Sequence, residues 1–179
     1  MGSYWFITPK ITYSLTHYND IKHARAEIDK SSTRSLPIYS FDTGLIFERN
    51  STVFGRETEQ TLEPRLFYAY IPYRNQRHMP NFDSSSADLN FAELFTPNKY
   101  TGFDRIANTN QLSAVLTTRY IDSGTGKEWF SATVGQRYYF TDEKVDLYWS
   151  NPGKTKNRSD VLAASQFSLF EGWRLEGAI

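Results

Sequence analysis

The residue types that most often carry out chemistry are few in this sequence, and their spacing does not suit it. The three histidines, His17, His23 and His78, lie far apart and lack the short spacing of metal ligands. The stretch GTGK at 124–127 is shorter than a phosphate-binding loop, and a hairpin turn is the simpler interpretation. There is no cysteine, which excludes disulfides and thiolate chemistry. These residues predict neither a metal site nor a cofactor.

One polar tract contains residue types that are found in reactive sites. Asp83, Ser84 and Asp88 could be part of a nucleophilic or calcium site, but a solvated loop explains the same composition. A catalytic triad needs a histidine beside a serine and an acid, and His17 is the only histidine within a strand-like segment. We therefore expect a protein that is not an enzyme.

Five charged residues are more informative, because they lie in segments that are otherwise rich in aromatic and β-branched residues: Asp42, Glu63, Arg65, Arg119 and Arg137. Charges that face a wide, wet lumen can pair without the full cost of burial. Two interpretations remain open for them. They could pair with one another to hold the strands in register, or they could contact another molecule.

The segments that would position these charges predict an all-β fold. Seven segments are rich in β-branched and aromatic residues, and almost none has a helical period; they are 4–18, 36–49, 61–73, 110–121, 128–140, 161–170 and 173–179. Most exceed the roughly five or six residues of a typical globular strand, and ten or more suit a strand that crosses a membrane at a tilt. The 13 phenylalanines and 12 tyrosines also favour interfaces.

Apolar and polar residues alternate within these segments, so one face of the sheet is apolar. We expect the convex face to carry Tyr39, Phe47, Leu112, Leu116, Phe130 and Val134, and the concave, lumen-facing side to carry the five charges. The segment 61–73 is ambiguous, because Phe67, Ala69 and Ile71 share the parity of Glu63 and Arg65. Its two prolines, Pro64 and Pro72, should mark a bulge, a strand end or a broken ladder. A soluble β-sandwich would show the same alternation.

The connections alternate between long and short. Long polar connections (19–35, 74–109 and 141–160) follow the first, third and fifth segments, and shorter ones (50–60, 122–127 and 171–172) follow the others. In an antiparallel up-and-down meander, all the long connections then lie on one side. This asymmetry is typical of outer-membrane barrels. The balance of 20 basic and 20 acidic residues gives no reason to expect a nucleic-acid partner.

Several stretches also resemble a known family. SLPIYSFDTGLIFER, EQTLEPRLFYAYIPYRNQ, NFDSS, YTGFDRIANTNQL and SATVGQRYYF occur in that order and are similar to the β-barrel of LptD, the lipopolysaccharide-assembly protein family of the outer membrane. The resemblance covers roughly residues 4–140. It implies an integral protein of the Gram-negative outer membrane, with a large barrel of 26 strands that exports lipopolysaccharide through a seam between its first and last strands.

The resemblance also implies partners. They are an LptE-type plug lipoprotein, lipopolysaccharide itself, the Lpt bridge components that deliver it through a periplasmic jellyroll, and the barrel-assembly machinery during folding. The second interpretation of the five charges is then contact with the plug or with a lipid headgroup. The chain shows neither a jellyroll nor the family's cysteines, and neither the first nor the last barrel strand. We therefore expect residues 1–179 to be a partial barrel domain, an arc of about seven strands from the middle of the wall. Another outer-membrane barrel, porin-like or enzymatic, and a soluble β-sandwich binding module remain the alternatives.

The long connection 74–107 carries too many apolar residues for a solvated loop: Phe82, Phe91, Leu94, Phe95, Tyr100, Phe103 and Ile106. Burial of half of them would offset part of the entropy of ordering the loop. We expect an ordered extracellular loop, anchored at YTGFDRI through Tyr100, Phe103, Asp104 and Arg105, that covers the barrel mouth. An ordinary mobile loop is the alternative.

Overall fold

A computed structural model describes residues 3–19, 31–147, 157–170 and 173–179. Seven strands, β1 (Ser3–Tyr18), β2 (Ser32–Val53), β3 (Arg56–Ile71), β4 (Thr109–Asp122), β5 (Glu128–Tyr139), β6 (Leu162–Phe170) and β7 (Trp173–Ala178), form the fold, with one 3-10 turn, η1 (Glu93–Phe95). All seven predicted segments are confirmed. No helix among the described residues is long and apolar enough to span a membrane.

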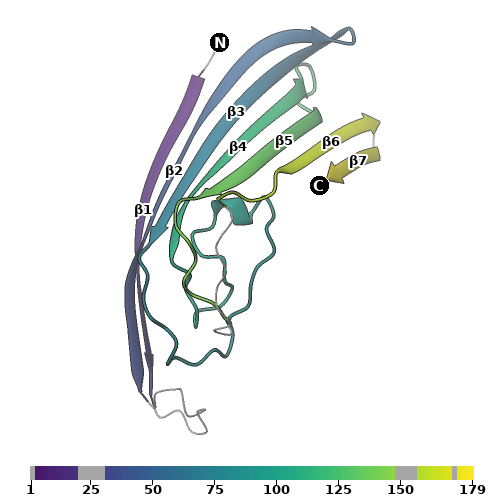
Figure 1. Ribbon diagram of the computed structural model, residues 1–179. Coiled ribbons are helices and arrows are strands. Elements are labelled where there is room, and N and C mark those ends of the chain that lie inside the picture. The colour runs from purple at the N-terminus through teal and green to yellow at the C-terminus, as the bar shows by residue number, and fades with distance from the viewer. Residues whose placement is uncertain (1–2, 20–30, 148–156, 171–172) are drawn as a thin grey trace.

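The strands form one sheet in the order β1-β2-β3-β4-β5-β6-β7, and each pairs antiparallel with its neighbours in sequence. The predicted up-and-down meander is therefore confirmed. The sheet curves into an open arc, and β1, β3 and β5 finish at the same end of it (Figure 1). The long connections therefore start on one side, as the sequence predicts; residues 20–30 and 148–156 of two of them lie outside the described residues.

One predicted connection is wrong. The polar run at 50–60 indicates a loop, but β2 and β3 continue to a two-residue turn of Phe54 and Gly55, both with positive φ. Such turns match the twist of paired strands. Alternation fails to reveal the strands here because both faces are polar. The stretch at 124–127 does lie in a hairpin turn, where an oxygen of Asp122 accepts hydrogen bonds from the backbone N–H of Gly124 and Thr125 at 3.1 and 2.8 Å.

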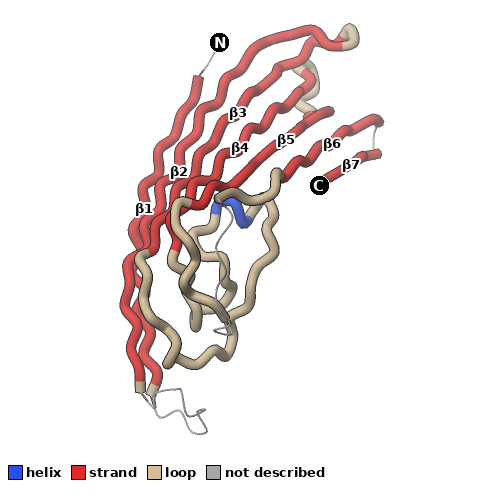
Figure 2. The backbone as a smooth tube through the Cα atoms, viewed as in Figure 1, coloured by secondary structure: helices blue, strands red, loops and turns tan. Residues whose placement is uncertain are grey.

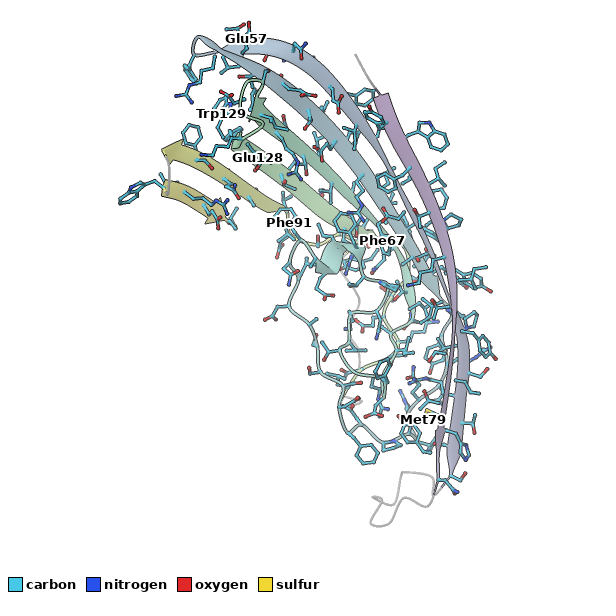
Figure 3. The ribbon with its side chains drawn as sticks, turned by 180° about the vertical axis from the view of Figure 1, so that it is seen from behind. Glu57, Phe67, Met79, Phe91, Glu128 and Trp129 are labelled. Carbon is cyan, nitrogen blue, oxygen red and sulfur yellow. The ribbon has the colours of Figure 1, made fainter. Side chains whose placement is uncertain are left out.

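The register defines the two faces of the sheet. Asp42, Phe67, Ser113 and Arg137 are direct neighbours across four strands, so they share a face. Figure 3 shows Phe67 on the concave side, which faces the loop after β3. The opposite, convex face carries the predicted apolar set, and Leu116 and Val134 are paired there at 41% and 43% exposure.

The ambiguous third segment has a simple explanation. Phe67, Ala69 and Ile71 do share the face of Glu63 and Arg65, but they are buried, because the loop between β3 and β4 folds back against that end of the sheet (Figure 2). One of the clusters beneath the loop joins Leu36 of β2, Ile71 of β3 and Ile106. The core of the described chain therefore lies between the sheet and this loop.

Both prolines occupy the predicted positions. The β2–β3 pairing stops between Gly44–Arg65 and Phe47–Leu62, opposite Pro64, which has no N–H to donate. Pro72 directly follows the last residue of β3.

Candidate functional site on the concave face

The five charged residues lie on the concave face but do not converge on one point. Arg65 binds Asp42 across the β2–β3 pair through two hydrogen bonds, from Nε to Oδ1 at 2.9 Å and from Nη2 to Oδ2 at 2.6 Å. The Arg65 guanidinium also lies 3.8 Å from the ring centre of Phe95 and 5.8 Å from that of Phe6. Since Phe95 belongs to η1, this pair connects two strands to the loop.

A second group lies nearer the short turns. Arg119 of β4 binds Glu63 of β3 at 3.0 Å and Glu128 of β5 at 2.9 Å, so it bridges three strands. The side chain of Arg119 is 43% exposed, and partly exposed ion pairs typically contribute less than about 1 kcal/mol each. These contacts therefore help to fix the register of the three strands more than they stabilise the fold.

Arg137 differs, because it is only 3% exposed. Its Nε donates to Ser113 Oγ at 3.3 Å, and its Nη2 donates to the carbonyl of Glu93 in η1. Leu94, fully buried, packs beside Gly135 and Val115. Arg137 therefore joins β5 both to the neighbouring strand β4 and to the loop.

The loop is ordered by its own polar contacts. The carboxylate of Asp83 accepts from the backbone N–H of Phe103 at 3.1 Å, and that of Asp104 accepts from the N–H of Phe82 and of Asp83. Ser84 Oγ accepts from the N–H of Asp104 and Arg105 at 3.1 and 2.9 Å. Two distant segments, 82–84 and 103–105, thus hold each other; we name them the Asp bracket.

The expectation of a solvated loop is therefore wrong for Ser84, which is buried, although Asp88 is exposed. Within the described residues no group of three or more His, Cys, Asp or Glu could hold a metal ion. His23 lies outside the described residues. Burial alone would raise the pKa of Asp104, but hydrogen bonds from Tyr18, Phe82 and Asp83 outweigh it and hold that pKa below its ordinary value.

The predicted loop residues have separate roles. Arg105 is 2% exposed and donates to the carbonyls of Pro80 and Met79 at 2.8 and 2.7 Å. The Tyr100 hydroxyl donates to Val145 O at 2.8 Å and Glu143 at 2.9 Å, and burial followed by the charge of Glu143 raises its pKa well above the ordinary value. Of the seven apolar side chains, Leu94, Tyr100 and Ile106 are buried, Phe91 and Phe95 partly so, and Phe82 and Phe103 exposed.

Comparison with known proteins identifies the family. The family model described as LPS transport system D, LptD, matches residues 1–179. An LPS-assembly protein LptD of Paraburkholderia xenovorans is 43% identical over 99% of this chain and 23% of its own length. Another, from Aromatoleum aromaticum, is 49% identical over 89% of this chain and 20% of its own length. The chain belongs to the LptD family.

The chain spans about a quarter or less of the length of these LptD relatives. The family description is that of a transport system and not of an enzyme, in agreement with the prediction from the sequence. Membership in the LptD family also agrees with the sheet itself, an open antiparallel arc.

A buried arginine that was not predicted from the sequence, Arg34, connects the start of β2 to the loop. Arg34 is 3% exposed and donates to Gln76 Oε1 at 2.9 Å and to the carbonyls of Asp104 and Phe103 at 2.6 Å each. It lies in the stretch assigned to a long connection. A signal was present, because Arg34, Leu36 and Ile38 continue the parity of the concave face. Gln76, whose amide donates to Ile106 O at 2.7 Å, gave no such signal.

Proposed function

We propose that the chain forms part of the wall of an outer-membrane β-barrel that assembles lipopolysaccharide into the outer leaflet of a Gram-negative envelope. Family membership supports this, since the relatives are named LPS-assembly proteins. The chain itself performs no covalent chemistry in this proposal. It provides an apolar exterior and a wet interior.

The convex face is the observation that carries the proposal. Near the long loops, Tyr39 and Tyr70 form an aromatic pair on it, and the polar Asn110 of β4 pairs with Tyr70 at the same level. Near the short turns, a row of aromatic residues crosses it, where Tyr120 pairs with Phe130 and Phe130 with Phe167. Ten residues of β4, from Asn110 to Tyr120, separate the two levels, which is about 34 Å along the strand at about 3.4 Å per residue. At a tilt of about 40° the height is about 26 Å, close to the roughly 25 Å band of membrane barrels.

Most side chains of this face between the two levels are apolar or small, and Gln136, which pairs with Ala114, is an exception. On β4 they are Leu112, Ala114, Leu116 and Thr118, and the described residues place nothing over them. A soluble β-sandwich would need a second layer on this face, since apolar patches of this extent are rare on soluble monomers. The described sheet has no such layer, which favours the barrel over the sandwich.

On the inside, we propose that Asp42, Glu63, Arg65, Arg119 and Arg137 face the lumen of the complete barrel. The first four support strand register through the pairs described above. Arg137 supports the loop. The loop between β3 and β4 would then fold into the lumen from the extracellular end and restrict it. An LptE-type plug, the Lpt bridge and the barrel-assembly machinery are the partners that family membership favours.

Two pairs of substitutions, one on each face of the sheet, test the proposal in the full-length protein. Leu116→Arg with Val134→Arg places two charges at mid-band on the convex face, at a cost of about 2–4 kcal/mol each in a bilayer. The matched control is Thr117→Arg with Thr133→Arg, the next pair along the same strands, which faces inward. We expect the first pair to abolish barrel assembly and the surface labelling of new lipopolysaccharide, and the control to retain both. Equal effects from the two pairs would refute the proposal.

A further inference from the structure

A hollow of about 300 Å³ lies on the concave side, between the long-loop ends of β4 and β5 and the connections that follow β3 and β5. Figure 1 shows the segment after β5 running beside the loop after β3. Hydrogen bonds from Tyr100 to Glu143 and Val145 hold these two segments together. The hollow is thus built from ordered parts of the chain.

Three cations line this hollow: Lys99, Arg137 and Arg158. Arg137 is buried, and no ion pair within the described part of the chain includes it; its side chain bonds a serine hydroxyl, a backbone carbonyl and the Tyr139 side chain. The Glu93 carboxylate attracts Arg137 without forming an ion pair with it. A buried guanidinium without a paired carboxylate is costly, because neutral acceptors replace only part of its hydration. An anion in the hollow would supply the missing charge.

The remaining charges leave the hollow positive. Two carboxylates, Glu143 and Asp160, also line the hollow, so its three cations outnumber its anions. Glu143 already forms an ion pair with Lys99. Arg158 is exposed. The amide of Gln111, fixed by its hydrogen bond to Thr96 O at 3.2 Å, adds a polar group of the kind that binds sugar hydroxyls.

We propose that this hollow binds the acidic part of a sugar, a phosphate or carboxylate group carried on a saccharide. The inference rests on the proposed function, in which the sugar belongs to lipopolysaccharide on its way through the barrel. The three cations bind the anionic group and the polar side chains bind neighbouring hydroxyls. A charge-assisted hydrogen bond is about twice as strong as a neutral one, so the cations account for most of the affinity.

The test uses the full-length protein in detergent and avoids the buried arginine. Arg158→Gln combined with Lys99→Gln removes two of the three cations while Arg137 stays in place. Three probes are titrated: purified lipopolysaccharide, the same lipopolysaccharide after enzymatic dephosphorylation, and inorganic phosphate. We expect the double variant to bind intact lipopolysaccharide about tenfold more weakly. Arg174→Gln, a change at an exposed arginine of β7 outside the hollow, is the control and should bind normally.

The probes separate the possible sources of the anion. Competition by millimolar inorganic phosphate supports a site for any phosphate, whereas loss of affinity only for the intact lipid supports a headgroup site. Unchanged affinity of the double variant for all three probes would overturn the inference. That outcome leaves the proposed function in place, because the latter is tested separately by the charges at Leu116 and Val134.

Discussion

At the scale of single residues, the concave face depends on side chains that bind backbone groups of the loop. Arg34, Arg105 and Arg137 are all buried, and each donates to at least one carbonyl between residues 79 and 104. Such bonds hold a loop in a single conformation, because a buried donor left without its acceptor costs about 1–3 kcal/mol. The Asp bracket then fixes segments 82–84 and 103–105 of the loop to each other.

Gly102, which directly precedes the second segment of this bracket, has no room for a side chain. Its φ is +73°, and a Cβ there would lie 2.5 Å from Asp83 Oδ1 and 2.7 Å from Asp83 O. We expect Gly102→Ala to destabilise the loop by about 1–3 kcal/mol and to speed proteolysis between residues 80 and 107 in the full-length protein. Gly55→Ala is the control: its φ is +76° but nothing lies within 4 Å. Equal protection of the loop in both variants would show that the contact with Asp83 is unimportant.

At the scale of elements, η1 packs the loop against the sheet through the side chain of Leu94. Gly135 of β5 leaves space for that side chain, since a Cβ at position 135 would lie 2.7 Å from Leu94 Cδ1 and 3.0 Å from Val115 Cγ2. We expect Gly135→Ala to displace η1 and expose residues 90–100 to hydrogen exchange. Leu94→Ala should cost about 2–5 kcal/mol by itself.

Combining Gly135→Ala with Leu94→Ala shows whether Gly135→Ala acts by displacing Leu94 or by a general loss of strand stability. With Leu94→Ala present, Gly135→Ala should add little further exchange, because the side chain that it displaces is absent. Additive effects would contradict a direct contact between the two positions. Phe82→Ala, a change at a side chain that is 73% exposed, serves as the control and should leave exchange unchanged.

The elements were largely predictable, while most of the site was not. Strands such as β4 and β5 are half apolar, so a period of two reveals both their position and their faces. The run at 50–60 concealed paired strands because both of its faces are polar. Arg34, Arg105 and Arg137 bind carbonyl oxygens, which every residue carries, and sequence alone gives no sign of which carbonyl is near. Phe67 is buried by a loop that is distant in sequence, so the only sign of its burial in the sequence is that an apolar residue shares the polar parity of β3.

At the scale of the whole molecule, the loop after β3 occupies the concave side of the wall (Figure 2). In a closed barrel it would restrict the lumen. We expect deletion of residues 82–100 from the full-length protein to increase the entry of a large antibiotic, measured as a fall in the inhibitory concentration, while the barrel still assembles. Unchanged permeability with normal assembly would mean that the loop is not a lid.

The central claim is that the convex face of this sheet contacts lipid and the concave face contacts water. Single cysteines at positions 111–118 of β4, labelled with a fluorophore in the full-length protein in liposomes, test it most directly. Quenching by brominated lipid should alternate: strong at 112, 114, 116 and 118, with the maximum near Leu116, and weak at the odd positions. Quenching that shows no alternation, or that is strongest at the odd positions, would contradict the account.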